Sequence, residues 1–179
     1  MKLLITTILI IISINCHAQK WKSFYNNQPY PNDWGVTLLT LDESDNSVWF
    51  ISSGILKHFK NGELIENNDL DPNNTIGLTT YVKDLKWHNG KLWILDEVGG
   101  LFKYENGIFT NESPGINRGT SIEFDAYDTL WIGTKYTNST VAVYGFKNGN
   151  YMFYNNSNSG FYTNKGYQAF KDSYDRTWI

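Results

Sequence analysis

Two histidines are the first side chains to consider for chemistry, because imidazole acts as an acid, a base or a metal ligand near neutral pH. His58 alternates with apolar residues in a β-rich run, and His88 stands at a turn. Neither belongs to a metal-ligand spacing or to a Ser/His/Asp set typical of nucleophilic catalysis. We therefore expect a structural or surface role for both, with no catalytic residue, no metal site and no cofactor.

Acidic residues form two further candidates. Residues 69–73 (Asp-Leu-Asp-Pro-Asn) alternate oxygen ligands as a calcium loop does, but glycine is missing at the sixth position and Thr80 stands where the closing glutamate belongs. Asp96 and Glu97 are adjacent between two predicted strands, and neighbouring side chains on an extended chain point in opposite directions. A general acid/base pair needs groups that face each other. We therefore expect a solvated connector at the first place and a polar loop at the second.

Tryptophans provide the strongest pattern. Trp49, Trp93, Trp131 and Trp178 are separated by 44, 38 and 47 residues, and each follows an apolar run and a polar turn. Such tryptophans can be platforms for sugars, but recurrence at one position of a repeat is typical of packing residues. We expect the first three to be buried between neighbouring repeats, with Trp178 at the same position of the last one.

Turn signals divide the repeat into short strands. Asn-Gly occurs at 61–62, 106–107 and 148–149, each time two residues after an aromatic residue. It predicts type I′ hairpins, and the expected following strands are 63–66, 108–111 and 150–154. All four prolines fall between repeats, where no strand needs their missing N–H groups.

A period near 40 residues with four short strands per unit is the signature of a β-propeller blade. The predicted fold is all-β: a partial propeller of about three four-stranded antiparallel blades plus an incomplete fourth. The units are roughly 36–66, 80–111 and 120–154, with a stump at 167–179. Residues 21–27 match residues 151–156, the fourth run of the third unit and the two residues after it, so they predict an outer strand of a closing blade.

The first eighteen residues have the pattern of a secretory signal peptide: Lys2, an apolar run, and Ala18 before the expected cut. The mature chain would then have 179 − 18 = 161 residues and no cysteine. A lipoprotein signal using Cys16 is an alternative that Asn15 disfavours. No later stretch is long and apolar enough to span a membrane. Basic residues are not clustered, and the net charge is −3, which argues against a nucleic-acid partner.

The repeats resemble a known family. Residues 128–134 (Asp-Thr-Leu-Trp-Ile-Gly-Thr) and 100–107 (Gly-Leu-Phe-Lys-Tyr-Glu-Asn-Gly) look like the two-component regulator propeller repeat. The first two units depart from it at Ser52-Ser53 and at Asp96-Glu97. The resemblance implies bacterial extracytoplasmic propellers, many of which are the sensing half of histidine-kinase sensors, often for carbohydrates. Because the sequence ends inside a predicted strand, we expect a truncated propeller or a fragment of a longer reading frame.

The expected function is a non-enzymatic, exported segment that binds a ligand or partner, either a carbohydrate or other extracellular ligand, or a protein. It would be periplasmic or at the cell surface. Loops on one face of a rigid scaffold usually carry binding. The candidate ligand contacts are therefore the aromatic residues of the connectors: Tyr30, Trp34, Tyr81, Tyr136, Phe161 and Tyr162. The alternatives are a structural or secretion-associated surface module, and an enzyme of the propeller-lyase or glycosidase kind.

Overall fold

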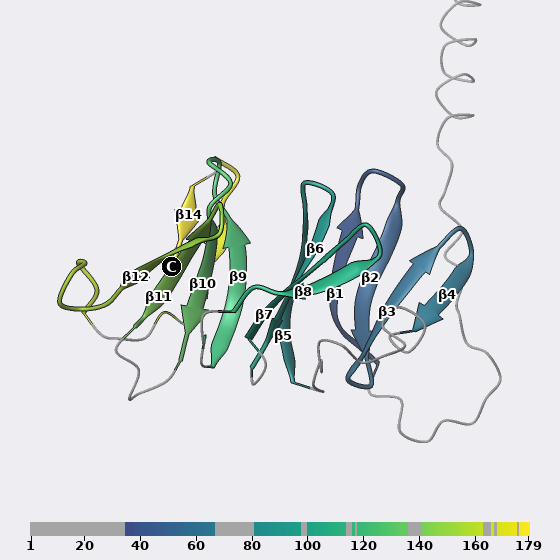
Figure 1. The fold of residues 1–179 in the computed structure, drawn as a ribbon, viewed down its shortest axis with the longest axis horizontal. Helices are drawn as coiled ribbons and strands as arrows, with labels where there is room; N and C mark the ends of the chain where they lie inside the picture. Colours follow the sequence, from purple (N-terminus) through teal and green to yellow (C-terminus); the bar gives the residue numbers. More distant parts are fainter. Residues whose placement is uncertain are drawn as a thin grey trace, which may run out of the picture. The chain divides into compact units, whose positions relative to one another are not determined.

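The chain is described by a computed structural model that covers residues 35–66, 81–97, 100–113, 116, 118–135, 141–162, 166, 168–174 and 176–179. Within these residues there are fourteen strands and no helix, which confirms the predicted all-β class (Figure 1). The expected signal peptide, the strand at 21–27 and the calcium-like residues 69–73 lie outside the described residues.

Three four-stranded antiparallel sheets follow one another along the chain, and each pairs its strands in sequence order. The first sheet contains β1 (Val36–Asp42), β2 (Ser47–Ser52), β3 (Ile55–Lys60) and β4 (Glu63–Glu66). The second contains β5 (Val82–His88), β6 (Lys91–Asp96), β7 (Gly100–Glu105) and β8 (Ile108–Asn111). The third contains β9 (Gly119–Phe124), β10 (Leu130–Thr134), β11 (Val143–Lys147) and β12 (Asn150–Tyr154). A two-stranded sheet of β13 (Phe170–Lys171) and β14 (Thr177–Trp178) completes a partial β-propeller.

The hairpin turns have the backbone that their sequence predicts. Both residues of the Asn-Gly pairs at 61–62, 106–107 and 148–149 have positive φ, as a type I′ turn requires. The strands that follow these turns begin and end at the predicted residues. Asn46, Gly90 and Asp128, each three residues before a repeat tryptophan, also have positive φ, so the first turn of each meander is tight for the same reason.

Strand register places the repeat tryptophans on equivalent faces of their sheets. Trp49 pairs with Thr40 and His58, and Trp93 pairs with Lys86 and Lys103. Directly paired residues of antiparallel strands project to the same side of a sheet. Each four-stranded sheet therefore has one face that carries its tryptophan, called here the Trp face, and one opposite face.

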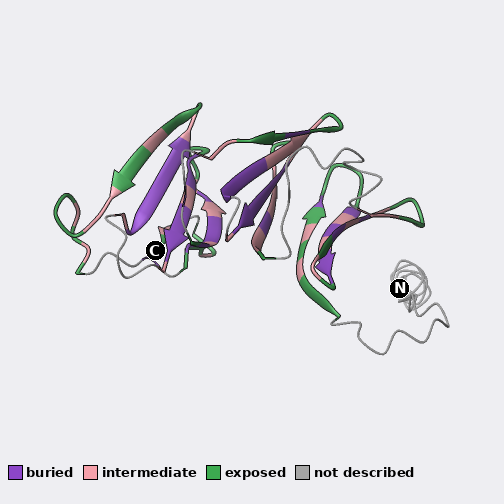
Figure 2. Cartoon of the chain, turned by 60° about the horizontal axis from the view of Figure 1, so that its bottom comes forward, coloured by how far each residue is buried: buried purple, intermediate pink, exposed green. Residues whose placement is uncertain are grey.

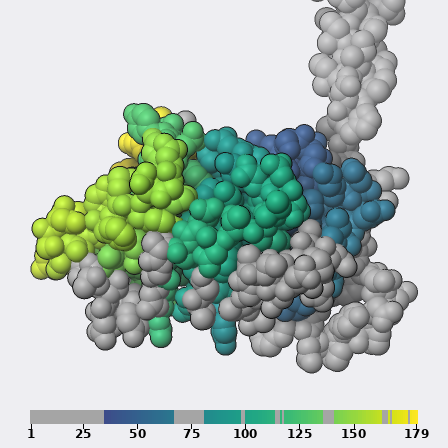
Figure 3. Space-filling view, in the orientation of Figure 1, coloured from purple at the N-terminus to yellow at the C-terminus, as the bar shows by residue number. Residues whose placement is uncertain are grey.

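Two apolar cores lie between consecutive sheets. In the first, Trp49 of the Trp face packs with Leu85 and Ile94 of the second sheet. In the second, Trp93 packs with Ile122 and Ile132 of the third sheet. The second and third sheets are neighbours in the space-filling view, and the burial colouring shows their buried strands in purple (Figures 2 and 3). The second sheet thus contributes its opposite face to the first core and its Trp face to the second.

Burial of the repeat tryptophans decreases along the chain. The indoles of Trp49 and Trp93 are buried, that of Trp131 is half-buried, and that of Trp178 is about half exposed. Among the described strands, those that face the Trp face of the third sheet are β13 and β14, which form a two-stranded sheet and so offer fewer strands to cover it. His58 is buried against Trp49 with ring centroids 3.8 Å apart, consistent with the expected structural role.

Side chains of the innermost strands bind the next sheet. Thr40 Oγ1 accepts the N–H of Trp87, and the Asp84 Oδ2 atom accepts the N–H of Ile122, at 2.9 Å and 2.8 Å. Ser121 Oγ accepts the N–H of Ala169 at 2.7 Å. Because these bonds join β1 to β5, β5 to β9, and β9 to the residue before β13, they fix how consecutive sheets align.

One predicted loop is wrong. Asp96 is not in a polar loop but is the last residue of β6, where it pairs with Val82 and Gly100 and is fully buried. The strand continues to Asp96 because its register with β7 is unbroken up to Gly100. Glu97 lies in the following turn and forms ion pairs with Lys83 at 2.7 Å and Lys135 at 3.2 Å.

The carboxylate of Asp125 ties the β9–β10 turn together and predicts a pH effect. Its oxygens accept the N–H groups of Tyr127 and Thr129 at 2.8 Å and the indole N–H of Trp131 at 2.9 Å. Burial works to raise the pKa of Asp125, but these hydrogen bonds outweigh it and hold the pKa below its ordinary value. The folded-state pKa is depressed, so this stabilisation is present above the unfolded-state pKa of about 3.9 and is lost as the pH falls through the folded-state value.

We expect Asp125→Asn to lower the free energy of unfolding by about 1 kcal/mol or more near neutral pH, and by less at about pH 3. Urea unfolding followed by circular dichroism at both pH values measures this difference. The matched control is Glu63→Gln, an exposed carboxylate at the start of β4. An Asp125→Asn loss that is equal at both pH values would contradict the account.

Candidate binding site

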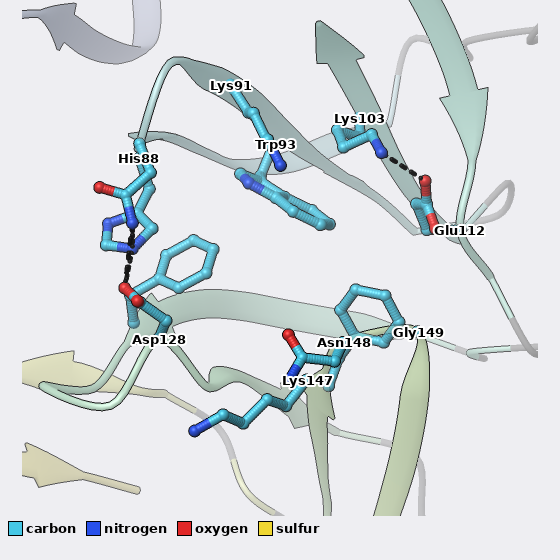
Figure 4. A pocket seen from close by; sticks show the side chains of 12 residues that line it. His88, Lys91, Trp93, Lys103, Glu112, Asp128, Lys147, Asn148 and Gly149 are labelled. Atoms are coloured by element: carbon cyan, nitrogen blue, oxygen red, sulfur yellow. Dashed lines mark hydrogen bonds and ion pairs between the residues drawn. The ribbon is translucent and has the colours of Figure 1, made fainter.

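A cavity of about 450 Å³ lies between the second and third sheets (Figure 4). It is at the end of the sheets where the β5–β6 and β11–β12 hairpins turn, opposite the end where the chain passes from one sheet to the next. Twelve residues line it: His88, Asn89, Lys91, Trp93, Lys103, Glu112, Phe124, Asp128, Phe146, Lys147, Asn148 and Gly149.

A polar cluster closes one end of the cavity. His88 ends β5, and its Nε2 atom lies 2.8 Å from the Oδ1 atom of Asp128 in the β9–β10 turn. The amide of Asn89 donates to the same Asp128 oxygen at 3.0 Å. The imidazole also stacks on Phe124, with ring centroids 3.8 Å apart. These contacts join two turns that are forty residues apart in the chain.

The charge of this cluster follows from its hydrogen bonds. The bond from His88 is the main cause that holds the pKa of Asp128 below its ordinary value, and the bond from Asn89 acts in the same direction. The Asp128 carboxylate is therefore ionised at neutral pH, where it serves as a hydrogen-bond acceptor. A general acid would need a pKa raised toward neutrality, which is the opposite shift.

Aromatic rings form the wall between the two ends. Trp93 meets Phe124 and Phe146 edge to face, with centroids 5.8 Å and 5.7 Å apart. Trp93 comes from β6, whereas the two phenylalanines come from β9 and β11. The wall of the cavity is thus part of the apolar core between the sheets, which keeps it rigid.

The ammonium group of Lys103 stands at the other end, whereas Lys91 is the cross-strand partner of His88. Lys103 pairs with Glu112 at 3.1 Å, and Lys91 lies 3.5 Å from Glu105. Burial works to lower the pKa of Lys103, but the hydrogen bond and charge of Glu112, with Glu105, outweigh it and raise the pKa. Figure 4 shows Lys91 beside Trp93, with the Lys103–Glu112 pair away from the His88–Asp128 pair.

The arrangement suits a neutral or weakly charged ligand with both polar and apolar surface. Donors and acceptors stand at two separate ends of the cavity, with an aromatic wall between them. In such a site a few polar groups fix the orientation of the ligand. Lys147 donates to the backbone carbonyl of Tyr127 at 2.6 Å, which holds the β11–β12 turn next to the β9–β10 turn. Both turns belong to the third sheet, so this bond fixes one side of the rim.

The predicted contact residues that the structure describes lie away from the cavity. Tyr30, Trp34 and Tyr136 are outside the described residues. Tyr81 precedes β5 at the opposite end of the second sheet, where its carbonyl accepts the N–H of Glu97 at 3.0 Å. Phe161 is half-buried and Tyr162 almost fully exposed, both beyond β12. None of the three described residues lines the cavity, and their role in binding stays a prediction.

Sequence reasoning missed His88 and Asp128 as partners. The sequence predicts a structural or surface role for His88 because no partner is near it in the chain. A signal was nevertheless present, because Gly90 and Asp128 occupy the same position of the repeat, three residues before a tryptophan. Equivalent turns of consecutive blades are neighbours in space, so residues beside these positions are candidates for contact.

No protein-family model and no curated protein matches the chain. Among solved structures, it is similar to the extracellular domain assigned to a one-component system of B. thetaiotaomicron, with TM-score 0.63 and 12% identity over 82% of this chain and 19% of that chain. It is also similar to the extracellular domain assigned to a hybrid two-component system of B. thetaiotaomicron, with TM-score 0.59 and 18% identity over 75% of this chain and 20% of that one. A streptogramin B lyase matches with TM-score 0.51 and 18% identity, over 68% of this chain and 41% of the lyase.

These likenesses define the class of fold. The chain is a partial β-propeller whose architecture occurs in extracellular domains of bacterial signalling systems and in a lyase. It spans about a fifth of the length of the two signalling domains. Within the described residues, no helix is long and apolar enough to cross a membrane.

Proposed function

We propose that this chain is a non-enzymatic, exported binding module of the sensor-propeller type, and that the cavity between the second and third sheets is its ligand site. The cavity carries the proposal, because it joins an ionised acceptor, ammonium donors and an aromatic wall on one rigid interface. The similar extracellular domains assigned to signalling systems share the fold and support a sensing context.

A carbohydrate is the ligand class that this chemistry favours. A sugar ring has apolar C–H faces that pack on aromatic side chains and hydroxyl groups that need both donors and acceptors. Asp128 offers an ionised acceptor, Lys91 offers donors, and Trp93 with Phe146 offers the apolar wall. A volume of about 450 Å³ falls in the usual range for sites of small ligands.

A binding role is favoured over catalysis by the state of the carboxylates. The pKa of Asp128 is lowered, so this carboxylate acts as an ionised acceptor, and Glu112 is held by Lys103 at 3.1 Å. Glycoside chemistry would need one carboxyl group with a raised pKa as the acid. The alternative of a structural surface module without a small ligand makes a distinct prediction, namely no saturable binding to the cavity.

Titration by tryptophan fluorescence with a panel of neutral and acidic saccharides tests the proposal. We expect saturable binding to at least one member, and we expect Asp128→Asn to raise its Kd about tenfold or more, since a lost charged hydrogen bond costs about 1.5 kcal/mol or more. Asparagine tolerates the positive φ that Asp128 adopts, so the substitution preserves the turn. The matched control is Asp45→Asn in the β1–β2 turn, which does not line the cavity.

The same titration separates the cavity from the connector face. Binding that is unchanged in Asp128→Asn but lost in Trp34→Ala, Tyr81→Ala or Tyr136→Ala would place the ligand at the connectors instead. Absence of binding across the panel would favour the structural surface module.

A further inference from the structure

The first sheet exposes an apolar face on the side away from the second sheet. Leu39, Leu41 and Leu64 are 67%, 46% and 51% exposed. Leu39 and Leu41 are two residues apart on β1, so they project to the same side. Across the sheet, Leu41 pairs with Val48, Val48 with Phe59, and Phe59 with Leu64. All three leucines therefore share one face of β1–β4. A contiguous exposed apolar surface of this kind marks an interaction site.

The corresponding face is covered in both of the following sheets. Leu39, Leu85 and Ile122 occupy equivalent positions in the first, second and third sheets. Each immediately precedes the residue of its own strand that pairs with the repeat tryptophan of that sheet. Leu85 is 3% exposed and Ile122 is fully buried. In both cases the cover is the Trp face of the preceding sheet. The fold therefore specifies what fits on the face of β1–β4, namely a sheet with a tryptophan on its second strand.

A face of that kind is exposed on the same chain. Phe170 of β13 pairs with Trp178 of β14, so the two aromatic side chains share the Trp face of the two-stranded sheet. Both are 48% exposed. The indole N–H of Trp178 donates to Asp172 at 2.9 Å, as that of Trp131 does to Asp125, which holds the ring in the orientation of the repeat.

We propose that two copies of this chain associate head to tail, with the Trp178-bearing face of one copy on the Leu39-bearing face of the other. Each contact would repeat the two interfaces that already exist between consecutive sheets.

Size-exclusion chromatography with light scattering, on protein expressed from the full printed sequence, tests the proposal over a range of concentrations. We expect a concentration-dependent dimer, and we expect Leu39→Glu and Trp178→Glu each to weaken dimerisation about tenfold or more. The matched control is Ile108→Glu, an exposed aliphatic residue at the start of β8, which should leave the dimer unchanged. Thermal unfolding by circular dichroism verifies that each variant is folded.

Mixing the two variants gives a second test that is specific to the head-to-tail arrangement. Leu39→Glu protein keeps an intact Trp178 face, and Trp178→Glu protein keeps an intact Leu39 face, so an equal mixture should recover dimers that neither forms alone. A monomer at all concentrations would overturn the proposal. It would mean that another occupant, such as further repeats of a longer polypeptide, covers this face. Dimers that persist in both variants, or a mixture that recovers none, would overturn it as well.

Discussion

Replacing Trp93 by alanine is expected to lower the free energy of unfolding by about 3–5 kcal/mol. The indole is 7% exposed and fills the core between the second and third sheets, where it meets Phe124 and Phe146 edge to face. Its removal loses both the buried area and the aromatic contacts, and it leaves a void that a sheet interface closes only partly. Urea unfolding monitored by circular dichroism measures the effect.

Two further substitutions are the comparisons for the effect of Trp93→Ala. Trp131→Ala is expected to cost less, about 2 kcal/mol, because its indole is half-buried. Tyr127→Ala, in an exposed turn, should change the free energy of unfolding by no more than about 0.5 kcal/mol. A Trp93→Ala loss below about 1 kcal/mol would show that the repeat tryptophans do not hold the sheets together.

Replacing Gly133 by alanine is expected to cost about 3 kcal/mol. A Cβ atom at this position of β10 would stand 2.3 Å from the carbonyl oxygen of Gly166. The obstacle is backbone, and it is held in place because the N–H of Gly166 donates to the carbonyl of Thr134 at 2.9 Å. Relief therefore requires the connector to move away from the third sheet and break that bond.

Gly160→Ala is the matched control for Gly133→Ala. No atom lies within 4 Å of the Cβ position at Gly160, so the free energy of unfolding should be unchanged or slightly raised. Thermal unfolding of both variants by circular dichroism makes the comparison. Equal melting temperatures for the two would contradict the close packing of the connector on β10.

Much of the fold was predictable because the repeat is local. The Asn-Gly pairs determine the β3–β4, β7–β8 and β11–β12 turns, since only residues that tolerate positive φ fit a type I′ turn. The tryptophan spacing predicts the register as well, because Trp49 and Trp93 occupy equivalent places in their sheets. These features depend on residues within a few positions of one another, which a sequence displays directly.

The candidate site was not predictable in the same way because its parts meet across an interface. His88 is isolated in its own hairpin, and its partner Asp128 belongs to another sheet. The position of Asp96 also depends on the length of a strand pairing and not on its own polarity. Contacts of this kind follow from how sheets stack, which the alternation of apolar and polar residues along one strand does not encode.

A crystal structure of the chain with the tightest-binding saccharide of the panel would locate the ligand. We expect electron density for the sugar in the cavity between the second and third sheets, against Trp93 and Phe146 and within hydrogen-bond distance of the Asp128 carboxylate. Density for the sugar at the other end of the sheets, beside Tyr81, with the cavity empty, would contradict this expectation.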